Sequence, residues 1–280
     1  MRSLTWREVW GWRLTRHGLL APKPEEDLVE VVRAVCGIHA QVMSAAELSI
    51  GVRLASGTRQ DVREALWQRR SLVKMHGLRG TVHLFPADEF PLWLAAFRAN
   101  PQPNEAQWLA QMGLEVAQRD AIAAAIGEAL DGQRLTREDL GREVAQRVGS
   151  WASEAVSPAF GGQWPRWQMA IGAAFTAGLL CFGPNEGNKV TFVRPDQWLG
   201  GWVEMDGEEA LREVFRRYLS AYGPATHRDF AQWFGMPPSR ALAVMQGLSG
   251  ELEEVDVEGY RPFLLQSDAA KDFPLAPDVV

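Results

Sequence analysis

A short phrase occurs three times in this chain, and it constrains the fold more strongly than any other feature of the sequence. Residues 58–62, 136–140 and 226–230 all read Thr-x-x-Asp followed by an apolar residue. A Thr hydroxyl at the start of a helix accepts a hydrogen bond from the third helical N–H, and an Asp at that third position reaches back and offsets the positive end of the helix. Each phrase therefore predicts the start of a helix.

Each of these predicted helices is followed by a second helix-like stretch and then by a strand-like stretch. The recurrence indicates one structural unit that is used three times. A helix-turn-helix with a β wing is the small unit that fits this order, and it is used mostly to hold nucleic acid. The predicted fold class is therefore mainly α with small β wings (α+β), in three tandem winged-helix units.

Turn and linker signals set the boundaries of these units. A proline-containing linker at residues 101–104 follows the first unit, and a Tyr-Gly-Pro stop at residues 222–224 ends a helix of the third. The predicted first, second and third units cover residues 1–100, 104–200 and 205–267, and residues 268–280 begin a further, extended β region.

Strand signals mark a wing in each unit. The wings are predicted at residues 71–85, 179–193 and 252–266. Between the second capping phrase and the second wing, residues 150–162 are predicted as a loop and residues 163–178 as a helix.

Composition places the chain among packed globular proteins. Of its 280 residues 46% are hydrophobic, so wholesale disorder is excluded. No apolar run reaches the ~18 residues of a membrane span, and the first residues lead into a polar-aromatic helix and not into a signal peptide.

Cys36 and Cys181 lie in separate apolar runs without metal-ligand spacing, so both are predicted as buried free thiols, and no metal or other cofactor is predicted. We therefore expect a cytoplasmic protein.

The net charge of −6 argues against nonspecific coating of nucleic acid, but the charge is unevenly distributed. Residues 52–83 carry seven Arg and Lys side chains against two acids, whereas residues 251–258 carry five acids and no base. A local basic segment of this kind is compatible with DNA binding.

Four stretches of the sequence resemble one family closely. They are residues 78–86 (Leu-Arg-Gly-Thr-Val-His-Leu-Phe-Pro), residues 178–184 (Gly-Leu-Leu-Cys-Phe-Gly-Pro), residues 222–233, which open with Tyr-Gly-Pro-Ala-Thr, and His39-Ala40-Gln41 between two early helices. With these phrases the chain resembles the winged-helix DNA glycosylases of the AlkZ and YcaQ type over most of residues 5–280.

The resemblance implies tandem winged helices and a C-terminal β-barrel clamped around duplex DNA, with the barrel truncated in this chain. The family removes alkylated purines, and some members unhook interstrand crosslinks. The expected protein is thus a monomeric DNA repair glycosylase whose partner is double-stranded DNA with alkylated bases, located with the nucleoid. The family's catalytic motif is Gln-x-Gln in one branch and Gln-x-Asp in the other. His39-Ala40-Gln41 matches the second position of the first form and departs from both at the first position.

His39 and Gln41 are therefore the predicted catalytic residues. Residues i and i+2 of an extended segment point to the same side, so both side chains would face one cavity. Hydrolysis of an N-glycosidic bond needs a water held near C1′ and stabilisation of a developing oxocarbenium ion, and a neutral imidazole and an amide oxygen both accept from that water. Imidazole can in addition act as a base near neutral pH, which Gln cannot.

The predicted reaction is monofunctional and leaves an abasic site. Purines alkylated at N7 or N3 already carry positive charge, so they leave without strong acid catalysis. No Lys lies beside the motif to form a Schiff base. The structural alternative for the pair is that His39 caps a helix C-terminus and Gln41 bonds to backbone.

The predicted DNA contacts, on the first wing and at a helix start, are Lys74, His76, Arg79, His83 and Arg166. Arg79 and His83 are four residues apart and share a face if the strand is regular. The alternative for the wing is a solvated face with Arg79 in an internal salt bridge. The alternative for the tryptophans that surround Arg166 is packing in the core.

Two other function classes fit the residues. One is a non-catalytic winged-helix DNA-binding protein or transcription regulator, although three fused units differ from the usual dimeric repressor with one unit per half-site. The other is a scaffold that binds another protein, which the net negative charge favours and the basic wing opposes. A Gln41→Ala variant separates enzyme from regulator, because it would abolish base release and leave DNA binding intact.

Overall fold

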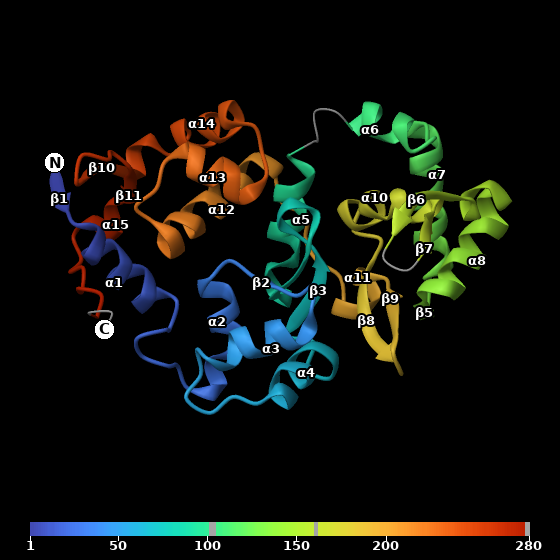
Figure 1. Cartoon of the computed structure of the whole chain (residues 1–280), viewed down its shortest axis with the longest axis horizontal. Helices are drawn as coiled ribbons and strands as arrows, with labels where there is room; N and C mark the ends of the chain where they lie inside the picture. Colours follow the sequence, from blue (N-terminus) through green and yellow to red (C-terminus); the bar gives the residue numbers. More distant parts are fainter. Residues whose placement is uncertain (101–104, 160–161, 278–280) are drawn as a thin grey trace. The chain divides into compact units, whose positions relative to one another are not determined.

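The computed structural model describes residues 1–100, 105–159 and 162–277, so the linker predicted at 101–104 lies outside the described residues (Figure 1). Helices provide most of the regular structure of these residues, and the strands form three small three-stranded sheets and one two-stranded sheet. The protein is thus a mixed helical and sheet structure, which confirms the mainly helical class with small β elements.

Contacts divide the chain into two compact units. One holds Met1–Leu72, Gly77–Ala99 and the chain from Met205 onward, and the other holds Val73–His76 and Asn100–Glu204. The first and third units of the predicted division fall mostly in the first compact unit, and the second falls in the other. The three-unit boundaries themselves stay a prediction.

One order of elements recurs along the chain: a helix, a short strand, two helical segments and two strands. Its first occurrence consists of α2 (Leu28–Ala34), β2 (Ile38–His39), α3 (Met43–Gly51), α4 (Arg59–Trp67), β3 (Leu72–His76) and β4 (Val82–Pro86). The three strands form a sheet in the order β2-β4-β3. The predicted wing at 71–85 is therefore present, and β2 adds a strand that the sequence did not predict.

The second occurrence contains an insertion. It consists of α7 (Val116–Ala129), β5 (Leu135–Thr136), α8 (Arg137–Val148), the short helices α9 (Arg166–Met169) and α10 (Ile171–Thr176), β8 (Cys181–Glu186) and β9 (Lys189–Val193). Its sheet has the same order as the first, β5-β9-β8. The inserted hairpin pairs β6 (Ala155–Ala159) with β7 (Gly162–Pro165).

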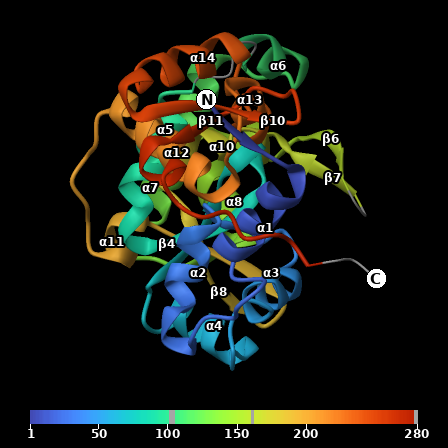
Figure 2. The same cartoon turned by 90° about the vertical axis from the view of Figure 1, so that its left-hand side faces the viewer.

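The third occurrence is completed by the N-terminus of the chain. It consists of α12 (Gly207–Tyr222), the single bridge residue Ala225, α13 (His227–Phe234), α14 (Pro238–Gln246), β10 (Leu252–Val257) and β11 (Phe263–Leu265). Ala225 exchanges two backbone hydrogen bonds with Phe263, with N···O distances of 3.0 and 2.9 Å. Strand β1 (Arg2–Leu4) pairs in parallel with the outer side of β10, beside which it lies in Figure 2.

The remaining helices connect or cover these elements. They are α1 (Trp6–Arg16), α5 (Phe90–Arg98), α6 (Glu105–Gln111), α11 (Pro195–Leu199), α15 (Gln266–Ala269) and the short 3-10 turns η1 (Glu25–Asp27), η2 (Leu78–Gly80), η3 (Ala87–Glu89), η4 (Ser150–Ser153) and η5 (Ser249–Glu251).

The three capping phrases begin helices, as predicted, but the second helix expected after each is absent after the first phrase, because α4 leads directly into β3. At Thr58 and Thr226 both halves of the capping box form, because each Thr hydroxyl accepts from the third helical N–H and the Asp carboxylate accepts from the Thr N–H. Thr136 accepts from Asp139 N–H at 3.2 Å and donates to its carboxylate at 2.6 Å. A further capping box, Thr5 with Glu8, starts α1 and was not predicted.

Two predictions for the second unit are wrong. The described part of residues 150–162 is not a loop, because η4 and β6 occupy most of it, and the helix expected from residue 163 begins only at Arg166, after β7. None of the hairpin side chains that the structure describes is buried. A strand without a buried face has nothing to impose an alternating pattern, which accounts for the missing strand signal at these described positions.

The segment predicted as extended after residue 267 is also partly wrong, since α15 occupies its start. The chain then packs on α1: Phe273 joins Leu4, Val9 and Trp12 in a core cluster with the apolar side chains of β10 and β11.

Candidate active site

Strands β2 and β4 bring His39 and Gln41 into an extended segment beside His83. The strands are antiparallel, with Ile38 opposite Leu84 and His39 opposite His83. The Ala40 N–H donates to the Val82 carbonyl at 2.7 Å, which continues the pairing beyond His39. His39 and Gln41 are exposed and Ala40 is buried between them. The extended geometry on which the shared-face prediction depended is therefore present.

Gln41 is oriented by the neighbouring strand. The Val82 N–H donates to Gln41 Oε1 at 3.4 Å. Gln41 therefore does bond to backbone, as the structural alternative for this residue expected. One such bond leaves a second lone pair on Oε1 that can accept from a water. The contact fixes which end of the amide faces the strand and leaves the NH₂ group directed elsewhere.

His83 is buried directly beside His39. Its side chain is 4% exposed, and its ring lies edge-to-face with the His39 ring, with centroids 5.4 Å apart and planes at 74°. Nδ1 lies 3.1 Å from the Thr81 carbonyl oxygen, so Nδ1 carries the proton and Nε2 is the acceptor nitrogen. Burial lowers the pKa of His83 to about 4; the Thr81 hydrogen bond opposes this shift, and electrostatic interaction with His39 and Arg79 adds to it.

This placement corrects the role predicted for His83 as a DNA contact. A ring that is almost fully buried has no face left for a phosphate. The expectation that Arg79 and His83 share a face of one regular strand is also wrong, because Arg79 lies in the turn η2 before β4 begins. His83 instead joins His39 and Gln41.

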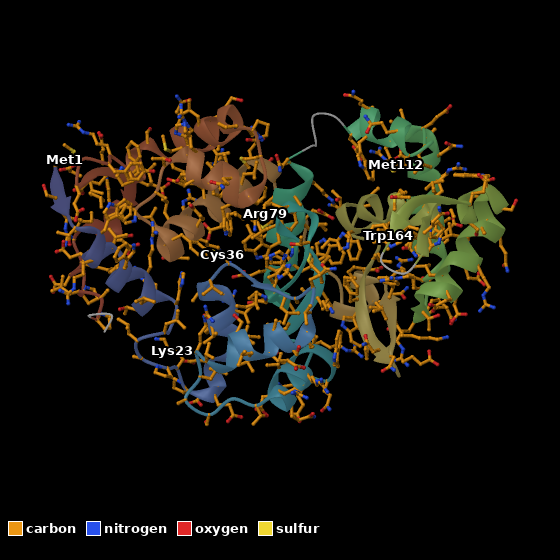
Figure 3. The ribbon with its side chains drawn as sticks, viewed as in Figure 1. Met1, Lys23, Cys36, Arg79, Met112 and Trp164 are labelled. Atoms are coloured by element: carbon orange, nitrogen blue, oxygen red, sulfur yellow. The ribbon has the colours of Figure 1, made fainter. Side chains whose placement is uncertain are left out.

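Arg79 projects from the turn that precedes His83. Its backbone has a left-handed φ of 53°, in a turn closed by Gly77 N–H donating to Thr81 O at 2.8 Å. The guanidinium is exposed, and it forms no ion pair with any residue that the structure describes, so the internal salt bridge considered above is not found. The stem of Arg79 lies against Gly235, next to the end of α13. Arg79 is labelled in Figure 3, as is Cys36, which lies three residues before His39.

Lys74 and His76, the other predicted contacts of the first wing, rest on aromatic rings. Lys74 Nζ lies 5.0 Å from the centroid of Phe182, and burial lowers the pKa of this ammonium group. His76 stacks on Phe175 with centroids 3.9 Å apart and planes at 10°. These contacts are typical of core and edge packing.

Arg166 is held by contacts with residues of the turn before the β6-β7 hairpin. Its guanidinium forms an ion pair with Glu154 at 2.8 Å and donates to the Trp151 carbonyl at 3.2 Å. Of the two flanking tryptophans, Trp167 is buried and Trp164 is 47% exposed on β7. The core alternative therefore holds for Trp167, and the guanidinium of Arg166 already has anionic and carbonyl partners.

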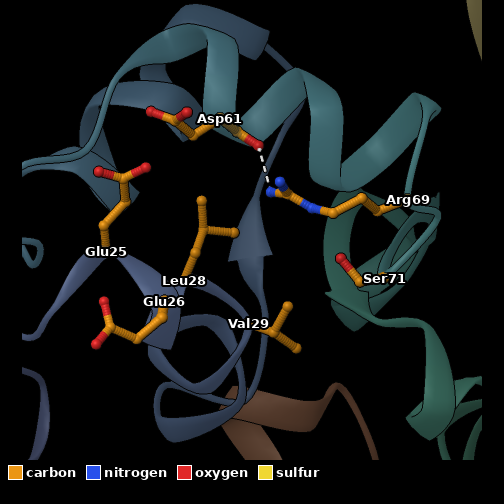
Figure 4. A pocket seen from close by; sticks show the side chains of 7 residues that line it. All are labelled: Glu25, Glu26, Leu28, Val29, Asp61, Arg69 and Ser71. Atoms are coloured by element: carbon orange, nitrogen blue, oxygen red, sulfur yellow. Dashed lines mark hydrogen bonds between the residues drawn. The ribbon is translucent and has the colours of Figure 1, made fainter.

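A pocket of about 430 Å³ lies elsewhere on the first compact unit (Figure 4). It is lined by Glu25, Glu26, Leu28, Val29, Asp61, Arg69 and Ser71. Three carboxylates against one guanidinium give it a negative charge, which repels DNA phosphates. It contains none of the predicted site residues.

In the part of the chain that the structure describes, no group of three or more His, Cys, Asp or Glu side chains is arranged to hold a metal ion. Among the same residues, no helix is long and apolar enough to cross a membrane.

The residue that sequence reasoning missed at this site is His83 as a neighbour of His39. The signal available was the Thr-Val-His-Leu-Phe run, which predicts a strand. The pairing register that places His83 opposite His39 depends on contacts distant in the sequence, so this run alone does not predict it.

Comparisons with known proteins place this geometry in a family. The sequence profile of a family described as DNA glycosylase AlkZ-like matches residues 32–280. An interstrand DNA cross-link repair glycosylase of Streptomyces sahachiroi is 32% identical over 279 residues, which are 98% of this chain and 73% of that protein. The solved structure of Streptomyces sahachiroi DNA glycosylase AlkZ superposes with a TM-score of 0.80 and 31% identity, covering 96% of this chain and 71% of that chain. The chain therefore belongs to the AlkZ-like family and is a DNA repair glycosylase.

Proposed function

We propose that this glycosylase hydrolyses the N-glycosidic bond of purines alkylated at N7 or N3 in duplex DNA, with a water positioned by His39 and Gln41. The observation that carries the proposal is the exposure of both side chains on an extended segment, with the intervening Ala40 buried. Two acceptors on one open side can hold one water between them.

The proposed chemistry divides the work between the two side chains. Gln41 has one amide oxygen lone pair bonded to Val82 N–H and a second for the water, so it is a fixed acceptor. His39 takes the proton of the water as the oxygen attacks C1′. The alkylated purine leaves as a neutral base because the electrons of the broken bond cancel its positive charge. The motif lacks an adjacent Lys, which favours a monofunctional reaction that leaves an abasic site.

The proposed DNA-binding framework is the element order that recurs three times. We interpret the three occurrences as winged-helix units with the predicted boundaries 1–100, 104–200 and 205–267, which hold the duplex as a monomer. Arg79 is the strongest candidate for a phosphate contact near the reaction, because it is exposed, free of ion pairs within the described chain, and belongs to the turn that leads into His83. The relative named for interstrand cross-link repair extends the proposal to crosslinked purines.

Base release from defined DNA tests this proposal. Duplexes are methylated with dimethyl sulfate, or crosslinked at N7 with a nitrogen mustard, and incubated with the full chain. Abasic sites are then cut by heating in alkali. We expect strand cleavage with at least one duplex, and its loss in a His39→Ala, Gln41→Ala double variant that still binds the DNA. Equal cleavage by the double variant would refute the site. Salt-sensitive binding of both duplexes without cleavage would instead favour a non-catalytic DNA-binding protein.

A further inference from the structure

His39 and His83 lie opposite each other on neighbouring strands, so a positive charge on one ring would be repelled by a positive charge on the other. Residues directly opposite each other in an antiparallel pair have Cβ atoms about 5 Å apart, and these two rings are in edge-to-face contact. If His39 accepts the proton of the attacking water, a positive charge appears on its ring. A second charged imidazole at this distance would oppose that step by like-charge repulsion.

The surroundings of His83 keep that second ring uncharged. Its Nδ1–H donates to the Thr81 carbonyl, which leaves Nε2 as an unprotonated acceptor. The charged or titratable groups that act on it are His39, across the strand pair, and Arg79, on the preceding turn. Both oppose a proton on Nε2. With its pKa lowered to about 4, His83 is uncharged near neutral pH.

The ring of His83 is also fixed in place. Phe85, two residues along the same strand, stacks beside it with centroids 5.8 Å apart and planes at 24°. Gly77 closes another side: a Cβ atom at Gly77 would lie 3.1 Å from His83 Nδ1 and 2.8 Å from the Phe85 ring. The buried ring therefore has one orientation, whereas the ring of His39 is exposed and can rotate against it.

We propose that His83 is a positioning residue for base release: a buried, neutral imidazole whose Nε2 accepts the N–H of His39 while His39 takes the proton of the attacking water. The inference rests on the proposed role of His39. The proton of the water moves to one nitrogen of His39, and the other nitrogen keeps its own proton and donates it to His83 as a hydrogen bond. The water oxygen bonds to C1′, the C1′–N9 bond breaks, and its electron pair leaves with the purine.

The proposed role needs an uncharged side chain at position 83 with a hydrogen-bond acceptor where Nε2 now lies. Replacements of His83 can separate this requirement from the packing of the ring. His83→Gln retains an acceptor near the position of Nε2. His83→Asn retains a donor for the Thr81 carbonyl but is too short to reach His39. His83→Phe fills the volume and removes both functions.

His17 supplies the matched control. It is also partly buried, its Nε2 lies 3.0 Å from the Ala221 carbonyl oxygen, and its ring is edge-to-face with Tyr222 at 5.0 Å and 72°. Burial lowers its pKa as well. The partners that the described structure gives His17 are Ala221, Tyr222, Arg53 and Arg13, none of them in the His39 segment. His17→Phe therefore reproduces the loss of a partly buried, hydrogen-bonded imidazole away from the proposed site.

The experiment is single-turnover base release from the DNA that the wild type processes, measured from about pH 5 to about pH 9, where imidazole titrates. We expect His83→Phe and His83→Asn to lower the maximal rate by about tenfold to a hundredfold, the range of a hydrogen bond to a charged group. We also expect their acid limb to move to lower pH, because the protonated form of His39 has lost its acceptor. His83→Gln should recover most of the rate and the position of the limb, and His17→Phe should change neither.

The outcomes are decisive even if one variant is unstable. If His83→Phe fails to fold, the comparison of Asn with Gln decides, because both side chains are polar and smaller than His. Equal rates and equal acid limbs for His83→Asn, His83→Gln and the wild type would overturn the inference. A loss of rate in all His83 variants with an unmoved acid limb would also overturn it, because such a loss indicates a packing role alone. If the His39→Ala, Gln41→Ala control releases base like the wild type, the proposed function has failed and not merely the role of His83.

Discussion

The indole of Trp12 stacks on the ring of Phe273, with centroids 4.3 Å apart and planes at 15°. This contact joins the first helix of the chain to its C-terminal segment. Arg2 reinforces it, with its guanidinium carbon 4.7 Å from the centroid of Phe273. Because β1 also pairs with β10, the N-terminal residues are part of the third recurring element group, although the sequence assigns them to the first. The stability of that group should therefore depend on residues at the opposite end of the chain.

Gly11 gives the sharpest test of this dependence. The C-terminal segment passes so close to α1 that a Cβ atom at Gly11 would lie 1.9 Å from the Pro274 carbonyl oxygen and 2.6 Å from Ala276 N. Gly11→Ala should lower the free energy of unfolding by about 2 kcal/mol, despite the better helix propensity of Ala. Urea unfolding measures this. Gly172→Ala is the control, since Gly172 is also helical but has open space around it, and it should be neutral or stabilising by up to about 1 kcal/mol. Equal behaviour of the two variants would contradict the close approach.

Glu89 should be far more important for stability than its exposed neighbours. Its carboxylate is 4% exposed and forms ion pairs with Arg33 of α2 and Arg217 of α12, while Trp93 Nε1 donates to it at 3.0 Å. Glu89→Gln leaves two guanidinium groups without their shared anion, and we expect a loss of about 3 kcal/mol. Glu30→Gln removes an exposed partner of Arg33 at 3.0 Å and should cost less than about 0.5 kcal/mol. Thermal unfolding of both variants at one pH provides the comparison. Similar midpoints would mean that the Glu89 network contributes no net stability.

The buried histidine at the site should make stability depend on pH. The pKa of His83 is about 4 in the folded protein, below its ordinary value near 6.5, so the unfolded chain binds the proton more tightly. The contribution is complete above about pH 6.5 and is lost as the pH falls toward about 4, and it amounts to roughly 3 kcal/mol. Denaturant unfolding between about pH 7 and about pH 4.5 should show this loss in the wild type and a shallower one in His83→Gln. Parallel curves would mean that folding does not lower the pKa of His83.

Local signals in the sequence predicted local structure well. The Thr and Asp of each capping phrase contact each other within a single helical turn, so their positions alone predict where α4, α8 and α13 begin. The same signal is present at Thr5 and Glu8, where a Thr-x-x-Glu box begins α1. The shared side of His39 and Gln41 was predictable for a similar reason, since side-chain alternation in extended backbone depends only on i and i+2.

What the sequence did not predict depends on register and on partners distant along the chain. Nothing near His39 indicates that β4 places His83 opposite it, because antiparallel register is decided by packing of the whole sheet. Among the side chains of β6 and β7 that the structure describes none is buried, and Trp164 is exposed, so no alternating pattern marks these strands. Arg166 was predicted as a DNA contact because its charge is visible in the sequence, whereas its ion pair with Glu154 is not.

Arg79 and Arg166 should differ in how they affect DNA binding. Arg79 is exposed and has no ion pair in the described parts of the chain, whereas Arg166 is bonded to Glu154 and Trp151. If Arg79 holds a phosphate, Arg79→Ala should weaken binding to duplex DNA and reduce the slope of log K against log salt by about one. Arg166→Ala should leave this slope unchanged and lower thermal stability. Fluorescence anisotropy at several salt concentrations measures both slopes, and an unchanged slope in Arg79→Ala would remove Arg79 from the interface.

His39→Gln tests whether the imidazole acts as a base or only as an acceptor. The variant converts His39-Ala40-Gln41 to the Gln-x-Gln form of the family's motif, so an acceptor for the water remains. An amide does not titrate, whereas an imidazole loses its basic form as the pH falls through the range in which it titrates. We therefore expect His39→Gln to retain base release but to lose the acid limb of the wild-type pH profile, with a lower maximal rate near neutral pH. Gln41→Ala, which leaves His39 in place but removes the other acceptor of the water, should abolish base release at every pH. If His39→Gln shows the wild-type limb, another group titrates in it, and the role of base must be assigned elsewhere.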